Sequence, residues 1–444
     1  MKKLDYLFGA LALAGFLACS NNEEVANVEV IQQRAQTYMP IGFSPLTKGA
    51  TRSTLINKTA DITSFLVRGT WGADAFTKLA GAPVGYTDKV WIEGRQVTLG
   101  GTDGPAMPSE GAVYGGFGSG IEIVNSSGWN YKNSDQMQFW PYYATGATST
   151  GEGESAVTTI NGYACLPLDF YAVTPANAGI GLEPSSQFTY TGAEVANMVD
   201  ICYAVAKNQT KSPVEMKFNH IFSQVIVKCK KADNYTVDIK NVTIGGVKPG
   251  GTLAMASVKD FSGNVQWGTT SGDVRTYPVY SSAAPFAVPN SAASESPVTM
   301  TPSGQELLLV PQSITKWDLS KPIFSATEGA EVTKQGYIAI TYRAKKSDAA
   351  SWTTASTEDG YTTTYFPLQT KWVMGKVYAY TLLFGGVADP DAPTTPDPEN
   401  PNPGTGDDNP GGYDENGNAK APSVPITFTA TVTDWEKQVV DISL

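Results

Sequence analysis

The segment 426–433 alternates strictly between apolar residues and threonine. The apolar positions are Ile426, Phe428, Ala430 and Val432, and a threonine follows each of them. Because successive side chains of an extended strand point to opposite sides, this pattern predicts a β-strand with one apolar and one polar face. Such a strand is stable only when a sheet covers its apolar face and pairs with its backbone. The chain must therefore fold around, or meet, a sheet that accepts this strand.

The rest of the chain also consists mainly of strand-like segments. Apolar or alternating stretches recur at 62–71, 167–175, 214–218, 220–229, 235–244, 306–312, 336–342 and 376–384. They are separated by many of the 44 Gly and 28 Pro residues, and sustained helical periodicity is hard to find. Short strands divided by Gly and Pro turns are typical of β-sandwiches. Only 193–207 leaves open a short helix that leads into a strand.

We therefore predict an all-β protein with two β-sandwich domains. A chain of 444 residues is long enough for two domains of ordinary size once a leader and a linker are set aside. The composition predicts an N-terminal domain at 53–212 and a C-terminal domain at 213–388.

Residues 389–423 differ from both predicted domains. The segment is rich in Pro, Gly, Asp and Glu and has almost no apolar side chains. Such a sequence buries too little apolar surface to fold, so it predicts an extended acidic linker. Its Asp-rich pieces could bind Ca²⁺, but their spacing fits no EF-hand loop, and we favour a solvated linker. The linker would tether the C-terminal segment 424–444, where Trp435 and 439–444 extend the strand or form another.

The N-terminus predicts export as a lipoprotein. Lys2 and Lys3 precede an apolar run at 7–18 that is too short to span a bilayer, and Cys19 follows directly. This order is typical of a lipoprotein signal peptide, 1–18, whose removal leaves Cys19 as the lipidated first residue. An ordinary signal peptide cut at another position is the alternative.

The segment 19–52 begins unusually for a folded domain. Residues 37–46 predict a short strand with Met39, Ile41 and Phe43 on one side. A flexible basic joint at 47–52 follows, before a new apolar pattern begins at Leu55. A joint of this composition is accessible to proteases.

Charge and motif content argue against several classes of function. The chain carries 42 Asp and Glu against 31 Lys and Arg, a net charge of −11, without a basic stripe that would bind nucleic acid. Its only histidine, His220, lies between Phe218 and an apolar strand, where a hydrogen-bonded structural role is expected. No Ser/His/Asp set, cysteine–histidine pair or histidine-rich cluster is visible. We expect no catalytic residue, cofactor or metal site.

Cysteine usage does not indicate a disulfide framework. After Cys19 the chain has Cys165, Cys202 and Cys229, an odd number for an exported protein of this size. A Cys202–Cys229 bond and buried free thiols both stay open.

Several motifs, in their order and spacing, resemble the fimbrillins, the subunits of type V pili. They are the joint at 47–52 before a core strand, FWP at 139–141, LDFYA at 168–172, KFNHI at 217–221, LLVPQ at 308–312 and KWVMGKVYAYTL at 371–382. The resemblance implies two transthyretin-like β-sandwich domains in tandem and transport to the cell outer membrane as a lipoprotein. It also implies that an Arg-specific or trypsin-like protease removes the first strand, and that a strand from the next subunit fills the groove.

Carried onto this chain, the resemblance implies that 19–52 is a propeptide whose removable strand is 37–46. Cleavage would fall between Arg52 and Ser53, whereas cleavage at the rival Arg34 would leave the strand in place. The donor would be Ile426–Val432, with or without the segment after Trp435, in this molecule or in a neighbour. The implied partners are other pilus subunits, the maturation protease and, through the lipid anchor, the outer membrane. A free donor strand favours a subunit of the shaft.

A non-polymerising surface lipoprotein that binds a glycan or a host protein is the main alternative. Exposed indoles could stack on sugar rings, and the candidates are the tryptophans at 71, 91, 129, 140, 267, 317, 352 and 372. We favour packing in the sandwiches for these side chains. A monomeric binding protein would need neither the joint at 47–52 nor a tethered strand.

Overall fold

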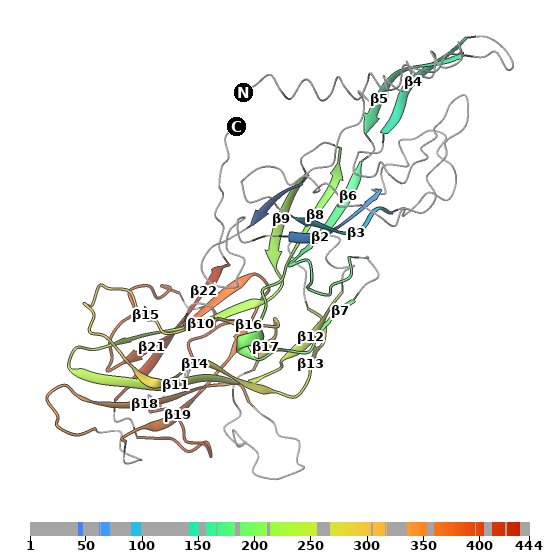
Figure 1. Ribbon diagram of the computed structural model, residues 1–444. Coiled ribbons are helices and arrows are strands. Elements are labelled where there is room, and N and C mark those ends of the chain that lie inside the picture. The colour runs from blue at the N-terminus through green and yellow to red at the C-terminus, as the bar shows by residue number, and fades with distance from the viewer. Residues whose placement is uncertain are drawn as a thin grey trace.

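We describe the fold from a computed structural model of the chain (Figure 1). It describes residues 43–47, 62, 64–71, 90–98, 142–150, 157–165, 167–182, 187–210, 214–254, 267–302, 305–315, 317, 335–352, 359–395, 397–403, 411–421 and 424–435. In these ranges the only helical segment is the 3-10 helix η4 (Val195–Asn197). None of the described segments forms a helix long and apolar enough to cross a membrane. The prediction of an all-β fold is confirmed.

The N-terminal region is built on a six-stranded sheet. Its order is β1 (Phe43–Thr47), β9 (Val214–His220), β8 (Cys202–Gln209), β6 (Leu168–Thr174), β2 (Ser64–Trp71) and β3 (Val90–Thr98). All neighbours are antiparallel except β1 and β9, which are parallel. The central strand β6 is buried on both faces, which explains its nearly continuous apolar sequence between two prolines.

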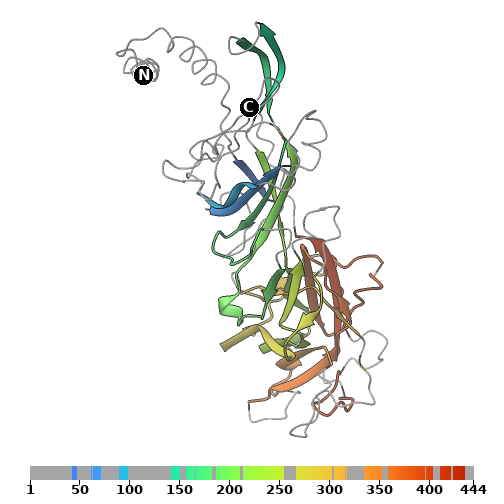
Figure 2. The same ribbon diagram turned by 90° about the vertical axis from the view of Figure 1, so that its right-hand side faces the viewer.

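A separate hairpin, β4 (Tyr142–Thr150) and β5 (Val157–Cys165), extends from the N-terminal end of the molecule (Figures 1 and 2). The ambiguous segment 193–207 resolves into η4 followed by β8. A short helix leading into a strand was therefore the correct alternative.

The C-terminal region contains two larger sheets. One has the order β15 (Val298–Thr299), β10 (Ser223–Lys231), β21 (Lys376–Phe384) and β22 (Ile426–Asp434), with β16 (Leu307–Leu309) also on β10. The other has the order β14 (Arg275–Ala287), β11 (Tyr235–Val247), β18 (Tyr337–Lys346) and β19 (Thr362–Pro367). Small sheets join β13 (Thr270–Ser271), β12 (Gly250–Ala254) and β7 (Gln187–Tyr190), and β17 (Ser313–Ile314) with β20 (Thr370–Lys371).

The two larger sheets pack face to face. The rings of Tyr342 on β18 and Phe384 on β21 lie 5.6 Å apart, and those of Phe366 on β19 and Phe428 on β22 lie 4.7 Å apart. Aromatic contacts of this kind, between sheets whose inner faces are apolar, define a sandwich core. The same buried cluster continues into the N-terminal sheet through Tyr171.

The change from one sheet to the next falls later than the expected domain boundary at 213. Strand β9 belongs to the N-terminal sheet, and β10 opens the C-terminal one after only Ile221 and Phe222. Apolar alternation runs through both strands, so the sequence pattern does not mark the crossing. Strand β7 also lies before residue 213 yet pairs with β12 in the C-terminal part.

Where the structure describes it, the acidic segment 389–423 is not an extended linker, and that prediction was wrong. Asn400 is 4% exposed, and its Oδ1 accepts hydrogen bonds from Thr370 Oγ1 at 2.8 Å and from the Lys371 backbone at 2.9 Å. Tyr413 is also buried and bridges to Tyr365 on β19. Specific polar contacts and one aromatic anchor therefore hold the segment on the sandwich although it offers few apolar side chains.

Replacing Asn400 with alanine tests this docking. The change leaves the buried Thr370 hydroxyl and the Lys371 N–H without their acceptor, which is expected to lower the free energy of unfolding by about 1–3 kcal/mol. Denaturant unfolding of the purified variant measures the loss. The exposed Asn416 supplies the control: its hydrogen bond to Asp414 is donated by the backbone N–H, which alanine keeps, so Asn416→Ala should leave stability unchanged. Equal stability of both variants would contradict a docked segment.

Candidate assembly site

The first strand lies at an edge of the N-terminal sheet. Among the described strands, β1 pairs with β9 alone, in parallel, from Phe43 opposite Val214 to Thr47 opposite Phe218. The sequence predicted a strand at 37–46; of its marked positions, Phe43 begins β1, while Met39 and Ile41 lie outside the described residues. An edge strand with one neighbour can leave without breaking the order of the remaining strands.

Strand β1 and the next strand along the chain, β2, are not neighbours in the sheet. Strand β2 lies between β6 and β3, so β9, β8 and β6 separate it from β1. The predicted cleavage site between Arg52 and Ser53 is in this connection, outside the described residues, as are Arg34 and Cys19. A cut in the connection would leave β1 held only by its pairing with β9.

Strand β9 is the surface that such a departure would uncover. Val214, Met216 and Phe218 are fully buried on its inner face, whereas Glu215 and Lys217 are exposed. The inner face would stay packed, but the backbone N–H and C=O groups that face β1 would lose their partners. A row of unpaired backbone groups is a template for another strand.

The alternating segment at the C-terminus is strand β22, and it completes a sheet of its own chain. It pairs antiparallel with β21, from Ile426 opposite Phe384 to Asp434 opposite Lys376. The predicted apolar positions Ile426, Phe428 and Ala430 are buried, and Val432 is half-buried. Its far side has no strand partner among the described residues, so β22 is an edge strand.

The end of β22 meets the end of β9. The indole of Trp435 lies parallel to the imidazole of His220, with ring centroids 3.8 Å apart. The backbone N–H of Trp435 donates to the Gly375 carbonyl at 2.9 Å. Because His220 is the last residue of β9, the final segment 436–444 starts beside the strand that pairs with β1.

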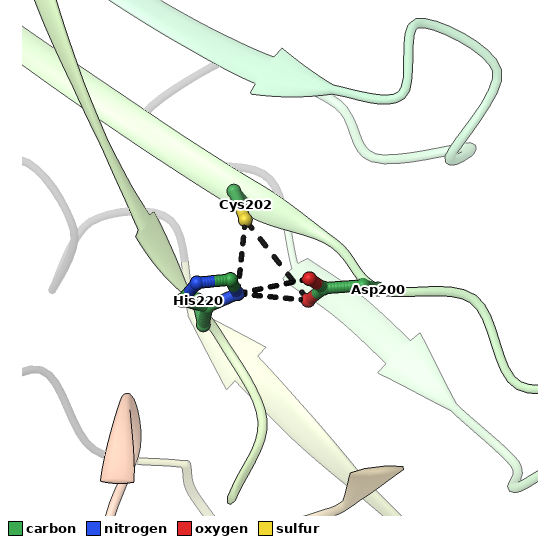
Figure 3. Close-up of side chains that lie close together, drawn as sticks. All are labelled: Asp200, Cys202 and His220. Carbon is green, nitrogen blue, oxygen red and sulfur yellow. Dashed lines mark hydrogen bonds and ion pairs between the residues drawn. The ribbon is translucent and has the colours of Figure 1, made fainter. Parts of the chain in front are cut away.

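His220 also belongs to a buried polar cluster with Asp200 and Cys202 (Figure 3). Its Nδ1 lies 3.0 Å from an oxygen of Asp200 and 3.2 Å from the sulfur of Cys202. The sequence showed no cysteine–histidine pair because eighteen residues separate the two. The pairing of β8 with β9 sets Cys202 opposite His220, and only a correct prediction of that register could have found the cluster.

The two described cysteines are free buried thiols, so the alternative of a Cys202–Cys229 disulfide is wrong. Burial raises the pKa of the Cys229 thiol to about 12, and that of Cys202 well above its usual value, with Asp200 adding to the rise. Burial therefore keeps both thiols protonated at neutral pH when nothing is bound to them.

Four of the candidate tryptophans make packing contacts: Trp267, Trp317, Trp352 and Trp372. Trp267, Trp317 and Trp372 are buried, at 7, 6 and 2% exposure. The Trp352 ring lies under the Arg343 guanidinium, 4.2 Å from its centroid. These contacts supply the expected core and edge packing.

Comparison with known proteins decides the family. A family model described as fimbrillin-like matches residues 120–397, which is more than half of the chain. The chain belongs to the fimbrillin-like family. This fimbrillin-like protein matches no curated relative by sequence.

Solved structures similar to this fimbrillin-like chain include a fimbrial protein from Bacteroides vulgatus. The two are 10% identical with a TM-score of 0.42, over 89% of this chain and 99% of that one. A fimbrial assembly protein from Parabacteroides distasonis is 10% identical with a TM-score of 0.30, over 78% of this chain and 91% of that one.

Membership of the family fits a structural protein of the cell surface rather than an enzyme. A fimbrillin-like protein is a component of fimbriae that assembles with other subunits.

Proposed function

We propose that this fimbrillin-like protein is a structural subunit of a type V adhesive pilus that polymerises by strand exchange. It is exported as a lipoprotein through Cys19, and a protease cuts between Arg52 and Ser53 at the cell surface. Strand β1 then leaves, and a strand of the next subunit pairs with β9. The observation that carries the proposal is that β1 is an edge strand with one neighbour, joined to the rest of its sheet by a long connection.

The position of β22 limits which segment acts as the donor. If Ile426–Val432 left the sheet, the buried side chains of Ile426 and Phe428 would enter water, at a cost of about 1.5–3 kcal/mol each. The backbone pairing with β21 would also be lost. We therefore assign the donor role to 436–444 and regard β22 as its fixed base.

The sequence of 436–444 suits this role. Val440, Ile442 and Leu444 alternate with Val439, Asp441 and Ser443, which gives one wholly apolar side. Nine extended residues span roughly 30 Å, more than the seven residues of β9, so the tail is long enough to cover that edge. Main-chain hydrogen bonds would give affinity, and the apolar positions would fix the register.

Arg52→Ala tests the maturation step. Treating the full-length protein with an Arg-specific protease, which does not cut after Lys48, should give a start at Ser53 by intact mass and N-terminal sequencing, together with an SDS-resistant ladder on unheated gels. The Arg52→Ala variant should keep residues 35–52 ahead of Ser53 and run as a monomer, because β1 stays connected to β2. Arg34→Ala is the matched control and should polymerise like the natural protein. A wild-type ladder from Arg52→Ala, or a wild-type monomer that keeps 20–52, would overturn the proposal.

A further inference from the structure

Three different metal-ligating side chains converge where the two regions of the molecule join. Asp200 precedes β8, Cys202 begins it, and His220 ends β9 (Figure 3). The first two are 1% exposed and the third is 3% exposed. Cys202 and His220 are direct cross-strand partners, and Asp200 lies two positions earlier along the same extended chain. The backbone of the sheet therefore fixes all three side chains in position.

One atom faces more partners than a single proton can serve. His220 Nδ1 lies 3.0 Å from both oxygens of Asp200 and 3.2 Å from the sulfur of Cys202. With the proton on Nδ1, the ring donates to the carboxylate but cannot accept from the thiol. With the proton on Nε2, Nδ1 can accept from the thiol, but its lone pair then faces the carboxylate oxygens. The thiol has only a weak alternative in Asp200 Oδ1, at 4.0 Å. A hydrogen-bonded triad leaves this arrangement poorly satisfied.

The separations suit a shared cation. All the candidate ligand atoms lie within 4.8 Å of one another. Around a tetrahedral zinc ion with ordinary bond lengths, ligand atoms lie roughly 3.3–3.6 Å apart. Small movements of the three side chains, each lengthening or shortening a contact by a fraction of an ångström, would bring them to that geometry.

The charges also suit a divalent ion. A thiolate and a carboxylate together neutralise a 2+ cation, and the neutral imidazole adds none, so the occupied site carries no net charge in a buried position. A sulfur, nitrogen and oxygen ligand set favours zinc over calcium or magnesium.

We propose that Asp200, Cys202 and His220 form a site for Zn²⁺. Binding forms one bond each to Cys202 Sγ, His220 Nδ1 and the Asp200 carboxylate. The thiol proton is released to solvent, and the ring proton of the histidine is held on Nε2. The indole of Trp435 covers the imidazole, and the second carboxylate oxygen or a water molecule takes the fourth position. The ion ties the start of β8 to the end of β9 and fixes the ring on which Trp435 stacks. This site does not depend on the pilus proposal.

Cobalt substitution of the full-length, tag-free protein tests the site. Protein refolded with Zn²⁺ and dialysed against metal-free buffer should hold one zinc per chain by elemental analysis. With Co²⁺ in its place, it should show a near-ultraviolet thiolate-to-cobalt charge-transfer band and the intense visible bands of a tetrahedral ion. Because a direct ligand is lost, Cys202→Ser should remove the ultraviolet band and weaken metal binding by at least about 10–100-fold. Cys229→Ser removes the other buried free thiol and should change neither.

The outcome is readable even if Cys202→Ser folds poorly. Asp200→Asn keeps the size of the side chain and the thiol, so it should retain a charge-transfer band but bind Co²⁺ more weakly. Wild-type protein without zinc and without the cobalt band would overturn the site. So would a band that disappears in Cys229→Ser and persists in Cys202→Ser.

Discussion

Deleting residues 436–444 is expected to abolish polymerisation while leaving the subunit folded. The deletion keeps β22, the stack of Trp435 on His220 and the Trp435 hydrogen bond to Gly375, so no described contact is lost. It removes the segment to which we assign the donor role. After cleavage at Arg52, the truncated protein should remain a monomer on unheated gels, with the denaturant midpoint of the full-length protein.

A substitution in β22 should have the opposite effect. Phe428→Ala removes a ring that is 5% exposed and packs edge-on against Phe366, which is expected to lower the free energy of unfolding by about 3–5 kcal/mol. Such a variant should polymerise when enough folded protein is present, because its tail is intact. A ladder from the truncated protein, or normal stability with lost polymerisation in Phe428→Ala, would return the donor role to 426–432.

The C-terminal segments 426–433 and 389–423 show what could and could not be predicted from the sequence. The strict alternation at 426–433 predicted a strand with one buried face. The structure confirms the strand, with Ile426, Phe428 and Ala430 buried and Val432 half-buried. It did not predict which sheet would accept the strand, because pairing partners are set by long-range packing and not by periodicity. The acidic composition of 389–423 predicted an extended linker without tertiary contacts, yet Asn400 and Tyr413 anchor that segment on the sandwich. A few specific buried contacts are enough to hold this segment on the sandwich, and its average composition does not reveal them.

The buried cluster was missed for a related reason. Asp200 and Cys202 lie on one side of a strand start, and His220 lies at the end of the next strand. In the sequence these positions look like isolated residues in apolar surroundings, and the only histidine was correctly expected to be hydrogen-bonded. The pairing register of β8 with β9 brings the three residues together, and local sequence patterns specify strand register poorly.

Locking β1 to β9 with a disulfide should separate cleavage from assembly. Ser44 is the register partner of Glu215, whose side chain is exposed. Paired strands lie roughly 4.8 Å apart, within the Cα separation that a disulfide spans. In the double variant Ser44→Cys/Glu215→Cys, oxidised protein should be cut at Arg52 yet keep β1 attached, which intact mass would show. No ladder should form, because the edge of β9 stays filled.

Reduction supplies the decisive comparison within one sample. Breaking the disulfide should release the cleaved β1 strand and restore the ladder, whereas Ser44→Cys alone should polymerise under both conditions. The native thiols Cys202 and Cys229 are buried and form no disulfide, so they should not take part in the lock. If the oxidised, cleaved and verifiably cross-linked protein still polymerised, the edge of β9 would not be the acceptor. Strand exchange would then have to use another edge, and the far edge of β22, which pairs with no described strand, is the first candidate.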